Sequence, residues 1–258
     1  MNKIARACVW NLALPLALLG VIALATEGGD SIFFPPLSQV FSAFPETWDW
    51  ARVTHDVVPS LYRLLVGLLI GAGFAVVAGT VLGMAPRLNL LANPVIAYLR
   101  ALPSPAIIPM FLILFGIGDL TKIATIALGT TWPMLLNTID GVRSVPAVQL
   151  ETMRVLGLPR LSRCWLCFRH ASPQFFAGAR QSISLAIILM VVSEMVMSTN
   201  GIGYAVIQFQ RQYSITRMWT GIILLGLLGV LAAWAGETLE RRCTRWYAGL
   251  HRRQELTR

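Results

Sequence analysis

Glu194 is the one acidic residue that lies well inside an apolar stretch of this sequence. A carboxylate at the centre of a membrane helix costs on the order of 3 kcal/mol, so it should face a cavity or a partner rather than lipid. Two interpretations follow. With its neighbour Ser193, it lines or gates a path for a polar solute; alternatively, it makes a structural hydrogen bond near the end of the helix, because Asn200 follows closely.

Other residue patterns argue against metal and nucleotide chemistry. Cys164, Cys167 and His170 have a ligand-like spacing, but a structural zinc site needs four ligands, usually in two pairs, and no second pair exists. The three histidines fall in different predicted loops, which does not favour a catalytic cluster. Neither Lys3 nor Lys122 ends a phosphate-binding loop of the form G-x4-G-K-[ST]. The sequence therefore predicts no bound cofactor in this chain.

The composition indicates a membrane protein. Of the 258 residues, 56% are hydrophobic and 13% are charged, whereas soluble domains carry about 25% charged residues. The net charge of +9 would suggest nucleic acid for a soluble chain. The bases are instead placed as a membrane topology requires, so no nucleic-acid partner is predicted.

Six membrane spans are predicted, because a helix needs about 20 apolar residues to cross a bilayer. The third and fourth are short. The spans are Ala7–Thr26, Leu64–Pro86, Ala101–Gly118, Ile123–Ile139, about Ile183–Met197 and Met218–Gly236. The expected fold class is an all-α polytopic membrane protein with about six transmembrane helices.

The charges between the spans predict the orientation. Most Lys and Arg residues lie in segments on the side of the N-terminus, whereas the first loop on the opposite side is acidic. Positive segments stay inside, so both termini are expected to be cytoplasmic. In an alternative interpretation, Lys3, Arg6 and Ala23-Leu24-Ala25 mark a cleaved signal peptide. Its apolar stretch is long for that role.

The spans also suggest how helices pack and where a solute passes. Gly67, Gly71, Ala75, Gly79 and Gly83 form a small-residue stripe in span two, which lets another helix approach closely. Residues 37–54 form either an amphipathic helix at the outer interface, where Trp anchors well, or an exposed loop.

Span three opens with Pro103, Ser104 and Pro105. Discontinuous helices often mark transport sites, although a plain turn at the membrane surface explains the prolines equally. Asn137, near the end of span four, is a further polar candidate for the same path. Arg63 and Arg100 each begin a span; either could attract an anionic solute, but snorkelling to the interface is the commoner role.

The basic segment 143–180 is predicted to contain a short helix over Gln149–Leu156, ended by Gly157 and Pro159. Such a helix between two spans suits docking in a groove of another protein. The alternative is a basic loop held by anionic lipid.

Several motifs occur in an order that resembles the permeases of the nitrate/sulfonate/taurine branch of ABC importers, from about Phe34 to Trp246. They are Arg100-Ala101-Leu102-Pro103 with Pro109; Phe115-Gly116-Ile117-Gly118 with Lys122-Ile123; Leu128-Gly129, Pro133, Asn137-Thr138, Gly141 and Arg143; Glu151-Thr152-Met153-x3-Gly157; Ser193-Glu194-Met195 with Gly201-Ile202-Gly203-Tyr204; and Leu239-Glu240-Arg241-Arg242. Two departures occur. Thr152 and Met153 replace two alanines, and Arg169-His170 replaces a Leu-Pro pair.

The resemblance implies a type I ABC-importer permease fold in a bacterial inner membrane. It implies two permease copies, here as a homodimer, two ABC ATP-binding subunits that hold ATP and Mg²⁺, and a periplasmic or surface-tethered solute-binding protein. Glu151, Thr152, Met153 and Gly157 would belong to the coupling helix that touches the ATPase. The chain would be a transport subunit, not an enzyme, for a sulfonate, nitrate or taurine-like anion.

The expected organisation is a first helix and outer loop in residues 1–59, a permease core in 60–240 with the coupling loop at 143–180, and a basic tail in 241–258. A secondary transporter acting alone and a lipid-modifying membrane enzyme are the alternatives. The first would normally show repeat symmetry. The second lacks the further aspartates that metal-assisted phosphotransfer needs beyond Asp140.

Overall fold

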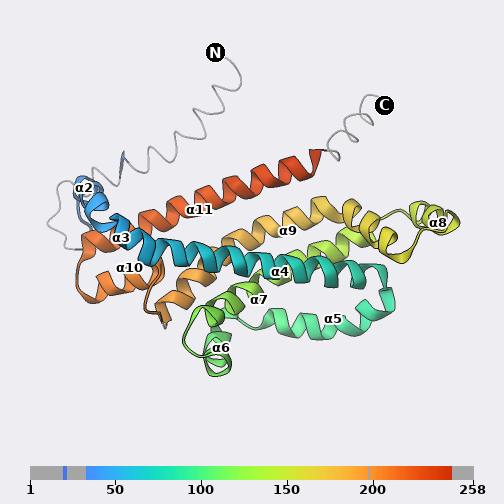
Figure 1. The fold of residues 1–258 in the computed structure, drawn as a ribbon, viewed down its shortest axis with the longest axis horizontal. Helices are drawn as coiled ribbons and strands as arrows, with labels where there is room; N and C mark the ends of the chain where they lie inside the picture. Colours follow the sequence, from blue (N-terminus) through green and yellow to red (C-terminus); the bar gives the residue numbers. More distant parts are fainter. Residues whose placement is uncertain (1–19, 22–32, 197, 246–258) are drawn as a thin grey trace, which may run out of the picture.

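The computed structural model describes residues 20–21, 33–196 and 198–245, and within these ranges the protein is helical throughout, with no strand (Figure 1). The predicted first span, Ala7–Thr26, falls outside the described residues except for positions 20 and 21. Most of the basic tail, from residue 246 on, also lies outside them.

Three helices of the described part are long and apolar enough to cross a membrane. The first is a continuous helix over Trp50–Met84, made of α3 (Trp50–Arg52), the π-helical turn η1 (Val53–Val57) and α4 (Val58–Met84). The others are α9 (Arg160–Val196) and α11 (Ile215–Cys243). These helices confirm the second, fifth and sixth predicted spans and the all-α fold class.

The third predicted span, Ala101–Gly118, is helical only over Ser104–Phe115, which is too short to cross a membrane alone. Helix α5 (Pro86–Ala101) ends where that span was expected to begin, and η2 (Ser104–Ile107) and α6 (Ile108–Phe115) follow after a bend of 86°. Pro103 and Pro105 explain the break, because proline lacks an N–H and disfavours helix in the residue before it. The bent pair counts at most as one further span.

Helix α7 (Asp119–Arg143) contains the fourth predicted span, Ile123–Ile139, and is longer at both ends. It is too polar to be one of the three membrane-crossing helices identified by composition. Most of its residues are buried by protein, including several threonines. Protein, rather than lipid, therefore surrounds much of this helix.

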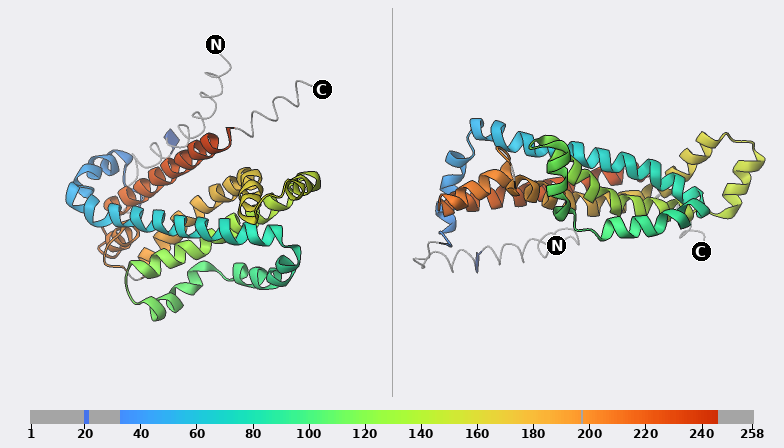
Figure 2. Two further views of the ribbon diagram at one scale, coloured as in Figure 1. Left: turned by 45° about the vertical axis from the view of Figure 1, so that its right-hand side comes forward. Right: turned by 90° about the horizontal axis from the view of Figure 1, so that it is seen from below.

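The core is built by α4, α7 and α9, which run side by side along the long axis (Figure 2). The predicted small-residue stripe of α4 is buried, and its partner is α7. A Cβ at Gly67 would lie 2.6 Å from Ile126, and a Cβ at Gly79 would lie 2.7 Å from Thr138. Glycine thus permits this close packing, as the sequence predicted.

The shorter helices occupy the two ends of this core (Figure 1). At one end lie α2 (Leu37–Thr47) and α10 (Ile202–Arg211), which pack against α11 through Trp48 and Phe209. Residues 37–54 are thus mostly helical rather than a loop, but they form two helices, and Trp48 between them is buried against Thr220. Their position at the membrane interface stays a prediction. At the other end, α8 (Ala147–Val155) projects between α7 and α9.

Candidate functional site

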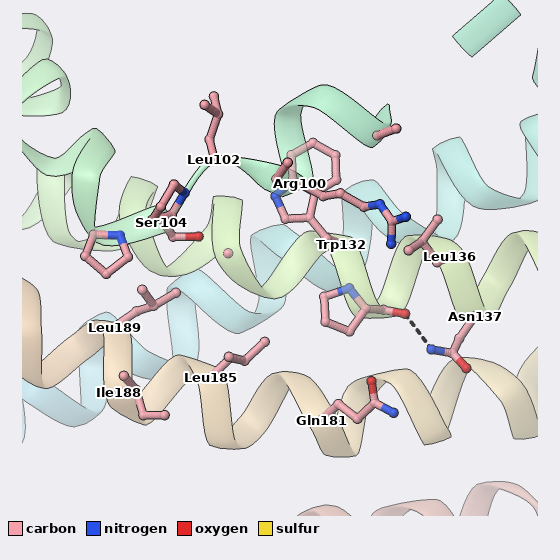
Figure 3. A pocket seen from close by; sticks show the side chains of 16 residues that line it. Arg100, Leu102, Ser104, Trp132, Leu136, Asn137, Gln181, Leu185, Ile188 and Leu189 are labelled. Carbon is pink, nitrogen blue, oxygen red and sulfur yellow. Dashed lines mark hydrogen bonds between the residues drawn. The ribbon is translucent and has the colours of Figure 1, made fainter. Parts of the chain in front are cut away.

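A pocket of about 750 Å³ lies beside the middle of α7 and α9 (Figure 3). Three parts of the chain form it: the end of α5 with the break before η2, the Gly129–Asn137 part of α7, and the Gln181–Leu189 part of α9. Residues from the predicted third, fourth and fifth spans therefore meet in one cavity.

The proline-rich break places backbone and polar groups at the wall of this pocket. Pro103, Ser104 and Pro105 all line it. Non-helical backbone at membrane depth is tolerated where it is buried in protein or lines a cavity. Glycine at position 129 lets Leu189 and Ser104 approach α7 closely, since a Cβ there would lie 2.2 Å from Leu189 and 3.1 Å from the Ser104 hydroxyl.

The polar groups of the pocket are few. Arg100 is its one cationic lining residue, and it makes no ion pair within the described part of the chain. Asn137 donates its amide N–H to the Pro133 carbonyl at 2.8 Å, which fixes the orientation of the amide. Gln181 and Ser104 complete the set. A compact anion would find a cation and hydrogen-bonding groups here.

The rest of the lining is apolar. Trp132 and Leu136 of α7 face Leu185, Ile188 and Leu189 of α9 around the cavity, and Figure 3 shows Asn137 and Gln181 toward one end and Ile188 and Leu189 toward the other. Ligand sites typically combine an apolar wall with a few placed polar groups. The arrangement suits a solute that has both an anionic head and an apolar body.

The structure brings together three of the path residues predicted from sequence, Pro103, Ser104 and Asn137. The other two, Glu194 and Ser193, do not line this pocket. Sequence reasoning did not identify Gln181 as a site residue. Its signal was its spacing, because it lies one helical turn before Leu185 on the α9 stripe that faces the cavity.

Glu194 lies fully buried near the α10 end of α9. Its carboxylate accepts hydrogen bonds from the Ser60 hydroxyl at 2.8 Å, from Arg63 Nη1 at 2.7 Å and from the Gly203 N–H at 3.0 Å. Ser193, also buried, bonds back to the Met190 carbonyl of its own helix. The structure thus shows the hydrogen-bonded arrangement that the second interpretation of Glu194 requires.

The snorkelling interpretation of Arg63 is wrong, because only 1% of this residue is exposed. Its Nε and Nη2 lie 2.8 and 2.7 Å from Asp119 Oδ1, and Nη2 also donates to the Asn200 side chain. Nη1 donates to Glu194 and to the Asn200 backbone carbonyl. Each of the three guanidinium nitrogens therefore donates at least one hydrogen bond, and the charge has no need to reach the interface.

The predicted stop at Gly157 is confirmed as a Schellman motif. Gly157 has φ +66°, its N–H bonds to the Arg154 carbonyl, and the Leu158 N–H bonds to the Met153 carbonyl. Helix α8 itself spans Ala147–Val155 rather than the predicted Gln149–Leu156.

Helix α8 has two distinct faces. Leu150 and Met153 pack toward Val142, Val145, Cys167 and Ala171 of the bundle. Glu151, Thr152 and Gly157 are exposed, and so are the large apolar residues Val148, Val155 and Leu156. Of the four predicted coupling residues, Met153 thus anchors the helix, whereas Glu151, Thr152 and Gly157 face away from the bundle.

Two comparisons of sequence identify the family. The family model described as "Binding-protein-dependent transport system inner membrane component" matches residues 49–245. A permease protein SsuC of Bacillus subtilis (strain 168), named for aliphatic sulfonates transport, is 35% identical over 191 residues, or 72% of this chain and 68% of the relative. The nitrate import permease protein NrtB of Synechococcus elongatus is 30% identical over 190 residues, or 70% and 68%.

A third relative and a solved structure agree with this assignment. The taurine transport system permease protein TauC of Escherichia coli (strain K12) is 27% identical over 222 residues, or 84% of this chain and 81% of the relative. The inward-facing MetNI methionine ABC transporter has a chain of similar fold, with a TM-score of 0.64 and 21% identity, covering 76% of this chain and 97% of that one. Within its type I permease fold, this multi-pass membrane protein is a transport subunit rather than an enzyme, and it belongs to the family of binding-protein-dependent transport system inner membrane components.

Proposed function

We propose that this permease imports a small organic anion of the sulfonate or taurine type, or a related anion such as nitrate. The observation that carries this proposal is the pocket beside α7 and α9, in which Arg100 has no acidic partner among the described residues. A free cation next to an apolar wall suits an anion with a short apolar body. The relatives named for aliphatic sulfonates, taurine and nitrate support the same class of solute.

Pro103, Ser104 and Asn137 belong to this solute path, together with Arg100 and Gln181. The pocket is partly open in the single chain. A second copy of the chain closes it in a homodimer, so that the path runs between two equivalent half-sites. The path crosses the inner membrane of a bacterium, with both termini and α8 on the cytoplasmic side and α10 on the outer side.

Helix α8 is the contact with the ATP-binding subunit, of which the complex holds two copies with ATP and Mg²⁺. Val148, Val155 and Leu156 are 72%, 87% and 68% exposed. An amphipathic helix presents such residues to a groove of a partner. Leu150 and Met153 hold the opposite face on α7 and α9, so movement of α8 moves the bundle.

ATP supplies the driving force in this scheme, and a solute-binding protein delivers the solute at the α10 end. ATP can switch the paired permeases only through contacts that differ between the two states. The exposed face of α8 and the open side of the pocket are the surfaces that provide such contacts.

Co-purification with the ATPase tests the proposal. The tagged chain is expressed with its neighbouring genes, and Val155→Asp is compared with wild type and with Tyr213→Asp, a change at a comparably exposed residue (83%) just after α10, at the opposite end of the core. We expect only Val155→Asp to lose the ATPase subunit while the permease remains folded. Glu151→Ala and Gly157→Pro should weaken the same contact. A wild-type chain that purifies alone and still takes up solute would contradict the proposal and favour a secondary transporter.

A further inference from the structure

Three consecutive backbone N–H groups at the start of α10 are held by side chains from other helices. Gly201 N–H donates to Asp56 Oδ1 at 3.0 Å, Ile202 N–H to Ser60 Oγ at 2.9 Å, and Gly203 N–H to Glu194 Oε2 at 3.0 Å. Helices usually receive such hydrogen bonds from their own cap residue, but α10 has no side-chain cap of its own. It is therefore capped by η1, α4 and α9.

The two glycines are required by this arrangement. Gly201 has φ +116°, and a Cβ there would lie 2.4 Å from the Glu194 carboxyl carbon. A Cβ at Gly203 would lie 2.6 Å from the Val191 carbonyl oxygen and 3.0 Å from Glu194 Cβ. The start of α10 is thus shaped around the Glu194 carboxylate.

Arg63 links the capped start of α10 to further helices. It holds Glu194 from the side of α4, binds Asn200 just before α10, and reaches Asp119 at the start of α7. One guanidinium therefore connects α4, α7, α9 and the segment that leads into α10. Its planar, fixed set of donors suits such a junction better than a flexible ammonium group.

Helix α10 also forms a wall of a second, polar pocket of about 770 Å³. Tyr204 and Gln208 of α10 and Gln212 just after it line this pocket together with Asp49 and Arg52. Asp56 lines this pocket and also accepts a hydrogen bond from the Gly201 N–H at the start of α10. A contact made at this pocket therefore acts directly on the capped end of α10.

Helix α9 connects the Glu194 cluster to α8. Helix α9 is unbroken from Arg160 to Val196, and Cys167 and Ala171 near its start pack with Leu150 and Met153 of α8. The distance along α9 from Cys167 to Glu194 is on the order of 40 Å at 1.5 Å per residue. Both α8 and α10 are thus attached to one continuous helix that is packed along α7.

We infer that Glu194 and Arg63 are positioning residues that fix α10 to the α4–α7–α9 core, so that docking of the solute-binding protein at the α10 end is transmitted to α8. The inference rests on the proposed contact between α8 and the ATPase. Its chemistry is specific: the carboxylate of Glu194 caps α10, and Arg63 holds that carboxylate in place.

The test uses the complete transporter reconstituted in lipid nanodiscs, with ATPase activity measured with and without the solute-loaded binding protein. Glu194→Gln keeps the shape of the side chain but removes the charge that Arg63 binds. Ser60→Ala is a milder variant that removes one hydrogen bond to Glu194 and one to α10. Glu237→Gln, an exposed glutamate paired with Arg241 on α11, is the matched control.

We expect basal ATPase activity within twofold of wild type in all three variants. The stimulation by the binding protein should fall to a ratio of about one in Glu194→Gln, fall partly in Ser60→Ala and remain in Glu237→Gln. Spin labels on Val58 of α4 and Arg211 of α10 supply a second measurement. Their distance distribution should broaden in Glu194→Gln and stay narrow in Glu237→Gln.

Three results would overturn the inference: unchanged stimulation in Glu194→Gln, an equal loss of basal and stimulated activity in Ser60→Ala, or a wild-type transporter that the binding protein does not stimulate. Failure of the proposed function is recognised separately, because Val155→Asp would then leave the ATPase bound. A melting temperature measured for each variant separates loss of transmission from loss of fold.

Discussion

Two arginines, Arg63 in α4 and Arg100 in the last turn of α5, have opposite surroundings. Arg63 is buried, and each of its guanidinium nitrogens donates to Asp119, Glu194 or Asn200. Arg100 lines an open pocket and makes no ion pair within the described residues. In the sequence, both simply precede an apolar stretch.

The difference shows how the fold separates a structural charge from one that is available to a ligand. A buried ion must be paired, because several kcal/mol of desolvation would otherwise oppose folding. The Arg63 site meets this demand internally and has no capacity left for a solute. The exposed Arg100 makes no ion pair among the described side chains, as the proposed anion path requires.

The largest expected effect is on stability at the Arg63 site. Arg63→Met should lower the free energy of unfolding by about 3 to 5 kcal/mol, because it leaves the buried Glu194 carboxylate without its cation. Thermal unfolding in detergent measures this. The double variant Arg63→Met/Glu194→Met should recover only part of the loss, since buried pairs are often replaced by apolar residues at little cost but the Gly203 N–H also loses its acceptor. A destabilisation below 1 kcal/mol in the single variant would contradict the comparison.

The second prediction concerns transport at the Arg100 site. Arg100→Ala should leave the melting temperature unchanged but raise the apparent KM for anion uptake about 10- to 100-fold, because a hydrogen bond to a charged group contributes about 1.5 to 3 kcal/mol. Uptake of radiolabelled taurine or an alkane sulfonate into proteoliposomes measures this. Arg87→Ala, on the same helix but outside the pocket lining, is the control. Equal uptake by both variants would remove Arg100 from the path.

Lysine substitutions sharpen the comparison further. Arg63→Lys should cost about 1 to 2 kcal/mol of stability, because an ammonium group cannot replace five fixed donors and leaves acceptors unmet. Arg100→Lys should retain uptake within a fewfold of wild type, since a point charge still attracts an anion. Unfolding and uptake are measured on both variants. If Arg100→Lys lowered stability and Arg63→Lys lowered uptake, the structural role would belong to Arg100 and the role in transport to Arg63.

The smallest effect is expected at the exposed edge of the Arg63 site. Asp119 pairs with Arg63, but its side chain is 52% exposed. Asp119→Asn should therefore cost no more than about 1 kcal/mol, as is typical of solvent-exposed pairs. High salt should reduce the difference in unfolding free energy between Asp119→Asn and wild type, because salt screens an exposed charge pair. An unfolding cost as large as that of Arg63→Met would show that Asp119, rather than Glu194, is the main partner.

Local sequence patterns predicted the features that depend on neighbouring residues. The small-residue stripe of α4, the end of α8 at Gly157 and three of the spans follow from spacing and from backbone preferences. The same local reasoning left open whether Pro103 and Pro105 mark a discontinuous helix or a plain turn before span three, and only the structure shows the 86° bend between α5 and the helical segment Ser104–Phe115. Apolar composition predicts membrane depth, but it does not predict whether a helix is continuous.

The sequence by itself determined the class of the protein, the three membrane-crossing helices that the structure confirms and the motifs that resemble a transporter family. Only the tertiary structure decided what each polar residue does. Ser60, Arg63, Asp119 and Glu194 are separated by up to 134 positions, yet they meet in one cluster. Arg100 and Gln181 meet at a pocket in the same way. The physical reason is that the state of a buried charge depends on the groups that surround it in space, and helix packing selects those groups.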